Sequence, residues 1–224
     1  MSEGPEQVVA RIAPTTTLES LADASIAVEA VFERLDVKQD VFRALDHVLG
    51  PRAVLATNTS ALPITQIAAA TSRPGSVVGM HFFNPAQIMP LVEVIATVVS
   101  DADQVDRAAA FASDVLGKTV VRAQDRAGFI VNKLLCPYIF EAVRMLEEGF
   151  ATREDIDAAM VNGAGYPMGP LTLSDLIGND TMLAVSEAFM SEYQDPRYAA
   201  PPLLRRMVEA GLLGRKTGQG FYEY

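Results

Sequence analysis

Two polar residues stand in neighbouring apolar runs, where they could act on a bound molecule. His81 closes the run that begins at Val77, and Glu93 lies within the next apolar run, residues 91–95. Histidine can act as a general base because its unperturbed pKa is near neutral. A carboxylate that holds one ring nitrogen would raise the basicity of the other. The pattern indicates a positioned base, although a lone histidine at a strand end more often bonds a backbone carbonyl and has only a structural role.

A second polar group follows an earlier apolar run. Asn58, Thr59 and Ser60 stand just past residues 53–56, which are expected to form a short strand. In open sheets of parallel strands, ligands bind beyond the carboxyl ends of the strands. The polar turn and His81 would therefore point into the same crevice.

These residues must be positioned by alternating strands and helices. Apolar runs and helical repeats alternate through the first half of the chain, which predicts a mostly parallel α/β sheet. Residues 25–31 are expected to be buried on both faces, and residues 8–12 to form a minor strand. The remaining expected elements are strands at 53–56, 77–80, 91–95 and 119–121, and helices at 37–48, after Pro63 and at 105–116.

The pattern becomes purely helical after Arg126, which predicts an α/β part at 1–126 and an all-helical part at 127–224. Residues 130–148 form a long apolar helical stretch with Pro137 inside it. Thr152 and Asp155 have the spacing of a helix-capping pair. Residues 162–170 contain so many glycines and prolines that we expect a loop. Helical spacing returns at 182–189 and at 203–210.

Composition excludes several classes of protein. The 224 residues carry a formal net charge of −10, which argues against a nonspecific nucleic-acid surface and is explained by solubility. The single cysteine, Cys136, excludes a disulfide framework and argues against zinc clusters, and it fits a reducing cytoplasm. The first residues lack the basic and apolar regions of a signal peptide. No apolar run approaches the length that a membrane span needs.

Six short motifs follow one another along the chain. They are Val-Glu-Ala-Val-Phe-Glu at 28–33, Thr-Asn-Thr-Ser at 57–60, His-Phe-Phe-Asn-Pro at 81–85, Gly-Phe-Ile-Val-Asn at 128–132, Pro-Met-Gly-Pro at 167–170 and Gly-Arg-Lys-Thr-Gly-Gln-Gly-Phe-Tyr at 214–222. In their order and spacing they resemble the motifs of the 3-hydroxyacyl-CoA dehydrogenases, including the 3-hydroxybutyryl-CoA dehydrogenases. The resemblance extends from about Arg11 to Tyr224.

The resemblance implies a partial Rossmann-like NAD-binding domain at 1–126. It also implies a helical domain at 127–224 that completes the cleft for an acyl-CoA substrate and forms a homodimer. His81 would take the proton of the substrate's 3-hydroxyl while hydride passes to NAD, and Glu93 would be its paired carboxylate. Ser60 and Asn132 would hydrogen-bond the reacting oxygens of the substrate. The residues expected along the cofactor are Ala30, Glu33, Lys38, Ser60 and Asn84.

Two of these polar residues can also be judged from their local sequence. Asn132 lies in an apolar helical stretch, where its amide needs a partner. Lys38 lies in the first turns of a predicted helix, where its alternative role is that of a solvated surface charge.

The sequence departs from the family at its beginning. The family starts with a strand, a Gly-x-Gly-x-x-Gly turn, a helix and a second strand that ends in an acid, and no residues before Ser25 have that glycine spacing. The glycine turn would hold the pyrophosphate of NAD at a helix N-terminus. Without its first strand, the strand at 25–31 would have an open edge.

Three origins of this departure remain open. The chain could be an artificial truncation or a misplaced gene start, the C-terminal half of a split enzyme whose N-terminal half is a separate polypeptide, or a shortened, catalytically silent paralogue that forms dimers or binds CoA esters. We expect weakened NAD binding and impaired turnover by this chain alone. A related NAD(P)-linked hydroxyacid dehydrogenase is a further alternative, but such enzymes usually have a lysine base in the helical part.

Overall fold

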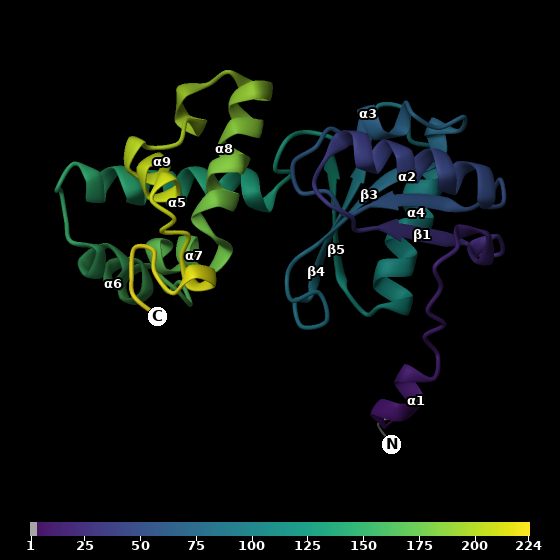
Figure 1. Cartoon of the computed structure of the whole chain (residues 1–224), viewed down its shortest axis with the longest axis horizontal. Coiled ribbons are helices and arrows are strands. Elements are labelled where there is room, and N and C mark those ends of the chain that lie inside the picture. Colours follow the sequence, from purple (N-terminus) through teal and green to yellow (C-terminus); the bar gives the residue numbers. More distant parts are fainter. Residues whose placement is uncertain (1–3) are drawn as a thin grey trace. The chain divides into compact units, whose positions relative to one another are not determined.

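The computed structural model describes residues 4–224, which form two compact units. The first unit contains the described residues up to Thr59 together with Ile64–Arg122, and the second contains Ser60–Pro63 and Ala123–Tyr224. The first is built on a sheet and the second on helices (Figure 1). This confirms the predicted fold class, a mostly parallel sheet with helices followed by a helical part.

The sheet has five strands in the order β1-β2-β3-β4-β5. Strands β1, β2 and β3 are parallel, and β4 is antiparallel to β3. The carboxyl ends of the three parallel strands therefore lie at the same end of the sheet. The strands are β1 (Ile26–Glu29), β2 (Val54–Thr57), β3 (Val77–Phe82), β4 (Leu91–Ala96) and β5 (Thr119–Gln124).

Alternation along the strands decides which side chains face which helix. One face packs against α4 (Ala102–Ala110), which continues into a π-helical turn at Phe111–Val115. The buried cluster on that face includes Val78, Met80, Val92 and Val94. His81 and Glu93 alternate with Met80 and Val94, so their side chains point to the opposite face.

That opposite face is covered by α2 (Leu35–Val48) and α3 (Ile64–Ala68), which pack against each other and the strands (Figure 1). Helix α3 approaches the backbone of Gly79 closely: a Cβ atom there would lie 2.5 Å from Ile64 Cδ1. Glycine at position 79 thus lets α3 sit on the strand that carries His81.

Strand β1 lies at the edge of the sheet formed by the described residues. The amides of Val54 and Asn58 donate to the carbonyls of Ser25 and Glu29, at 3.0 and 2.9 Å. Because backbone groups of successive residues point to alternate sides of a strand, those of Ile26 and Val28 point away from β2. The prediction of a strand buried on both faces is wrong for Val28, which is 40% exposed.

The second unit consists of helices around one apolar core. Its long helix α5 contains Pro137, as predicted, and supplies the buried residues Ile139, Phe140 and Val143. The helices are α5 (Val131–Glu147), α6 (Arg153–Ala164), α7 (Pro170–Ile177), α8 (Asn179–Tyr193) and α9 (Pro202–Glu209), with short 3-10 turns at Pro196–Tyr198 and Arg215–Thr217.

Two buried aspartates hold this unit together. Asp157 of α6 accepts hydrogen bonds from the backbone amides of Leu171 and Thr172, at 2.8 and 2.9 Å, and so caps the beginning of α7. Asp175 of α7 accepts from the amides of Phe221 and Tyr222, both at 2.9 Å.

The glycines of the 214–222 motif give the chain room to pass close to Asp175. A Cβ atom on Gly220 would lie 2.0 Å from Asp175 Oδ1, and one on Gly214 would lie 2.3 Å from the Asp175 carbonyl oxygen. The motif is therefore explained, in this unit, by the close packing of the C-terminal segment on α7.

The structure confirms the predicted helix cap at Thr152, whereas the predictions for residues 8–12 and 162–164 are wrong. Thr152 accepts from the amide of Asp155 at 3.1 Å and donates to its carboxylate at 2.7 Å, as the capping pair requires. Residues 8–12 were expected to form a strand, but Pro5–Val9 form α1, and its backbone bonds are satisfied without a partner strand. Residues 162–164 belong to α6 and not to a loop, because Gly165 is the residue that leaves the helix, at φ +72°.

In the part of the chain that the structure describes, no helix is long and apolar enough to cross a membrane.

Removing the Asp175 carboxylate should loosen the C-terminal segment. Asp175→Ala leaves two backbone N–H groups without their acceptor, and we expect it to lower the free energy of unfolding of the helical unit by about 2–4 kcal/mol. All six tyrosines lie at 138–224, so tyrosine fluorescence during urea unfolding reports this unit.

The matched control is Asp180→Ala, which removes a half-exposed ion pair with Lys216 near the same segment. Equal destabilisation by the two substitutions would contradict the role given to Asp175.

Candidate active site

His81 and Glu93 form a buried pair at the carboxyl end of β3. The antiparallel pairing of β3 with β4 places the two residues directly opposite each other. His81 Nδ1 and Glu93 Oε2 lie 2.8 Å apart, and the side chains are 5% and 0% exposed. The Phe83 ring meets the imidazole edge to face, with 4.6 Å between the ring centroids. The Glu93 carboxylate can accept a hydrogen bond from a proton on Nδ1. Nε2 is then the ring nitrogen that can take up a proton.

The ends of the two neighbouring parallel strands carry a second buried network, centred on Glu29. Glu29 is the last residue of β1 and pairs in register with Thr57, the last residue of β2. Thr57 Oγ1 donates to Glu29 Oε2 at 2.8 Å, and the amide of Val31 donates to Oε1 at 2.6 Å. Lys38 Nζ also lies 2.7 Å from Oε1. The carboxylate is thus satisfied without water.

The network extends to the expected cofactor residue Glu33. Lys38 Nζ lies 3.3 Å from Glu33 Oε2, and Thr59 Oγ1 donates to Glu33 Oε1 at 2.5 Å. The side chain of Glu33 is 44% exposed, whereas that of Lys38 is 1% exposed. Lys38 is therefore not a solvated surface charge.

The remaining expected site residues follow the carboxyl ends of the parallel strands or belong to the helical unit. Ala30 follows β1 and Asn84 follows β3, and both are exposed. Ser60, half-buried, belongs to the second unit, as does Asn132, the second residue of α5. Close polar contacts join His81 to Glu93 and Lys38 to Glu33.

The polar turn after β2 is tied to β3. The Asn58 side chain accepts from the amide of Phe82 at 2.8 Å. Asn58 thereby fixes the turn that contains Thr59 and Ser60 against the strand that carries His81.

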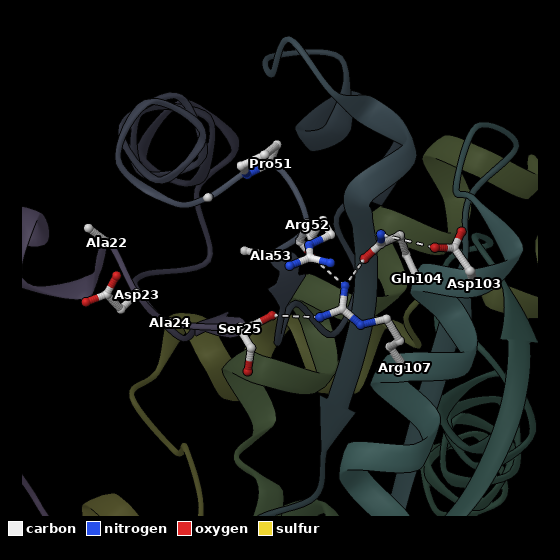
Figure 2. A pocket seen from close by; sticks show the side chains of 11 residues that line it. Ala22, Asp23, Ala24, Ser25, Pro51, Arg52, Ala53, Asp103, Gln104 and Arg107 are labelled. Carbon is white, nitrogen blue, oxygen red and sulfur yellow. Dashed lines mark hydrogen bonds between the residues drawn. The ribbon is translucent and has the colours of Figure 1, made fainter.

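A cavity of about 570 Å³ in the first unit lies at the other end of the strands (Figure 2). Ser25 and Ala53, which precede β1 and β2, line it together with Gln104 and Arg107 of α4. The Arg107 guanidinium donates to the carbonyls of Arg52 and Ser25 and to Gln104 Oε1, so it ties α4 to the strand ends. His81 lies near the carboxyl end of β3, so this cavity is not the candidate active site.

Cys136 is not a nucleophile in this fold. It is buried within α5, and burial raises the pKa of its thiol to about 12. The thiolate, which is the reactive form, is therefore scarce at neutral pH.

Sequence reasoning missed Glu29 and Thr57 as parts of the network. The available signal was an acid inside an apolar run, because a buried carboxylate needs a cation or hydrogen-bond donors. The choice of Lys38 as that cation depends on how α2 packs against β1, which local sequence does not determine.

Comparison with known proteins identifies the family. The model of the 3-hydroxyacyl-CoA dehydrogenase NAD-binding domain matches residues 1–126, and that of the 3-hydroxyacyl-CoA dehydrogenase C-terminal domain matches residues 128–224. The chain belongs to the 3-hydroxyacyl-CoA dehydrogenase family. This family is one of NAD-dependent oxidoreductases, as the sequence resemblance predicted.

Relatives within this family are similar over nearly the whole chain. A 3-hydroxybutyryl-CoA dehydrogenase of Mycobacterium tuberculosis is 53% identical over 211 residues, which cover 94% of this chain and 74% of the relative. The human mitochondrial hydroxyacyl-coenzyme A dehydrogenase is 42% identical over a region that covers 98% of this chain and 70% of the human protein. The crystal structure of (S)-3-hydroxybutyryl-CoA dehydrogenase from Ralstonia eutropha has a TM-score of 0.94 at 42% identity, with 98% of this chain and 77% of that chain covered.

The buried Glu29–Lys38 pair makes a prediction about stability. Lys38→Met leaves a buried carboxylate without its counter-charge, and we expect a loss of about 3–5 kcal/mol in the free energy of unfolding of the first unit. The double variant Glu29→Gln, Lys38→Met removes both charges and should recover most of that loss. Hydrogen exchange of the β1 and β2 amides measures both effects.

The matched control is Arg34→Met, which breaks an exposed ion pair with Asp36 in the same turn. Screening by water makes such pairs weak, so the amide exchange rates of Arg34→Met should equal those of the wild type. A double variant no more stable than Lys38→Met would argue against charge pairing as the cause.

Proposed function

We propose that the chain oxidises (3S)-3-hydroxyacyl-CoA to 3-ketoacyl-CoA, with NAD reduced to NADH, and that His81 and Glu93 are the base and its orienting acid. The observation that supports this most strongly is the 2.8 Å contact between His81 Nδ1 and Glu93 Oε2 in a buried position. The names of the relatives, 3-hydroxybutyryl-CoA and hydroxyacyl-coenzyme A dehydrogenases, supply the substrate class.

The proton step follows from the tautomer that Glu93 favours. His81 Nε2 takes the proton of the 3-hydroxyl as the C3 hydrogen leaves with its electron pair, and a carbonyl forms at C3. Glu93 stabilises the imidazolium that results. Ser60 and Asn132 donate hydrogen bonds to the reacting oxygens of the substrate. In the reverse direction, the imidazolium returns the proton to the oxygen as the ketone is reduced.

The residues at the strand ends fit the nicotinamide side of NAD. When bound, NAD supplies the hydride acceptor. The residues proposed to lie along it follow the carboxyl ends of parallel strands or lie near those ends: Ala30, Glu33, Lys38, Ser60 and Asn84. The pyrophosphate side has no matching turn in this sequence, since none of its 15 glycines form a Gly-x-Gly-x-x-Gly pattern. We therefore propose that these 224 residues bind NAD weakly by themselves.

The two parts of the chain are proposed to have different functions. Residues 1–126 would bind the cofactor, and residues 127–224 would complete the acyl-CoA cleft and form a homodimer in the cytoplasm. Leu134 and Phe150 support a partner surface on the helical unit, since these large apolar side chains are 73% and 75% exposed. A separate N-terminal half could pair with the open edge of β1, where the backbone groups of Ile26 and Val28 point outward.

NADH formation from 3-hydroxybutyryl-CoA, followed by absorbance, tests the reaction. We expect slow turnover by the 224-residue chain and a rise of at least ~100-fold in kcat/KM for NAD when the Gly-x-Gly-x-x-Gly segment of a family member precedes it, because a helix N-terminus then holds the pyrophosphate. Equal rates for the two proteins would refute the weak binding. No NADH from either protein would refute the dehydrogenase assignment.

In the extended protein, His81→Asn should lower kcat about 10²- to 10⁴-fold, the usual contribution of a general base. Asparagine keeps a hydrogen-bond donor for Glu93, so the fold is retained. Glu93→Gln should lower kcat by a smaller factor. His47, the other histidine, is exposed on α2, and His47→Asn is the control. A His81→Asn protein with the control's kcat would exclude His81 as the base.

A further inference from the structure

Strand β3 continues past the point where its pairing with β2 ends. The register of β2 with β3 ends where Thr57 lies opposite Gly79. Strand β3 runs on to Phe82, and β4 pairs with it through this whole stretch, as far as Phe82 with Val92. The last three residues of β3 therefore have β4 on one side and lie beyond the end of the β2 register on the other. His81 is the middle one of these three residues.

The side chain of Asn58 supplies the acceptor that β2 no longer provides there. Asn58 Oδ1 accepts from the amide of Phe82 at 2.8 Å. Backbone groups of successive strand residues point to alternate sides, so those of Phe82 face the β2 side and those of His81 face β4. Asn58 thus takes the place of one further residue of β2, directly beside the residue that carries the imidazole.

This acceptor is presented from a backbone that is itself held in place. The amide of Asn58 donates to the Glu29 carbonyl at 2.9 Å, and the amide of Thr59 donates to Thr57 Oγ1 at 3.3 Å. The first bond ties the turn to β1 and the second lies within the turn, so neither depends on the Asn58 side chain. Loss of that side chain should therefore free the end of β3 and leave the turn, with Ser60, in place.

The residue that Asn58 holds lies between two side chains that touch each other. His81 precedes Phe82 and Phe83 follows it, and residues two apart in an extended chain point to the same face. The centroids of the Phe83 ring and the imidazole are 4.6 Å apart, and Glu93 Oε2 lies 2.8 Å from the imidazole Nδ1. The Glu93 contact fixes only one atom of the imidazole, so the direction of Nε2 also depends on the backbone at residue 82.

From this geometry we propose that Asn58 is a positioning residue for His81. The proposal rests on the proposed function, in which His81 Nε2 takes the proton of the 3-hydroxyl. Asn58 acts through the Phe82 amide and not on the substrate. By holding the backbone between the two rings, it keeps Nε2 directed at the place where the 3-hydroxyl is proposed to bind. A general base that leaves this geometry loses rate, because proton transfer requires hydrogen-bonding distance.

The structural part of the test uses the 224-residue chain without ligands. In Asn58→Ala the Phe82 amide loses its acceptor, and we expect its hydrogen exchange to become about tenfold faster. The nuclear Overhauser effect between the His81 and Phe83 rings should weaken, because the backbone between them is no longer held. Asn58→Asp keeps an oxygen acceptor at the same reach and should restore both the exchange rate and the ring contact.

The matched control is Thr97→Ala, just beyond the end of β4 that pairs with Gly79. Thr97 Oγ1 accepts from the amides of Val99 and Ser100, at 3.1 and 3.0 Å. Thr97→Ala therefore removes a side-chain acceptor of backbone amides from the same unit, but far along the strands from Phe82. It should speed exchange at Val99 and Ser100 and leave the contact between the His81 and Phe83 rings unchanged.

Kinetics are measured on the extended protein with 3-hydroxybutyryl-CoA and NAD. Asn58→Ala should lower kcat about tenfold with both KM values unchanged, since the base is displaced while the groups that bind the substrates remain. Asn58→Asp should recover kcat, and Thr97→Ala should have the wild-type kcat.

The outcomes distinguish the two proposals. An Asn58→Ala chain with faster Phe82 exchange but an unchanged ring contact would overturn the positioning role. An equal loss of kcat in Asn58→Ala and Thr97→Ala would also overturn it, because general loosening of the first unit would then be the cause. No NADH from the extended wild type would overturn the proposed reaction, and the ring contact in the 224-residue chain would still decide whether Asn58 orients His81.

Discussion

A carboxylate removed from water must be neutralised by a cation or by several hydrogen-bond donors, and this requirement organises the candidate site. Glu93 has no exposed side-chain surface, and the imidazole of His81 supplies a hydrogen-bond donor to it. The antiparallel pairing of β3 with β4 makes the contact possible, because residues 81 and 93 lie opposite each other on one face of the sheet. The same contact that satisfies the acid also fixes the ring, so stability and the proposed chemistry depend on one hydrogen bond.

The same requirement recurs at three other buried acids, with different partners. Glu29 is neutralised by Lys38 and joins two strand ends. Asp157 and Asp175 instead accept backbone N–H groups and fasten α7 to the rest of the helical unit. In the first unit, the buried acids are therefore paired with side chains at the carboxyl ends of the strands. In the second unit, they accept hydrogen bonds from backbone amides and so join segments of the chain.

Much of this fold could be predicted from sequence, because apolar runs and helical repeats are local signals. The strands near 53–56, 77–80 and 91–95 are present with small shifts of their ends. The errors have physical causes. Residues 8–12 favour strands by residue type, but Pro5–Val9 form α1 through local backbone hydrogen bonds. Asn162 and Gly163 are accommodated in the last turn of α6, where Asn162 bonds the Ala158 carbonyl at 2.9 Å.

The site was harder to predict than the fold. The pairing of His81 with Glu93 depends on the antiparallel register of β4, and no local pattern determines it. The family resemblance gave roles to His81 and Glu93, whereas Glu29 and Thr57 received none, although they lie inside the motifs at 28–33 and 57–60. Lys38 shows the limit most clearly, since a lysine near the start of a helix is usually solvated and this one is enclosed by Glu29, Glu33 and Val31.

Glu93 is proposed to hold the His81 ring so that Nε2 is the proton acceptor. The ¹⁵N chemical shifts of the His81 imidazole, measured by NMR on the selectively labelled protein above neutral pH, test it directly and need neither cofactor nor substrate. We expect the proton on Nδ1, and loss of that preference in Glu93→Gln. A ring protonated on Nε2 in the wild type would contradict it.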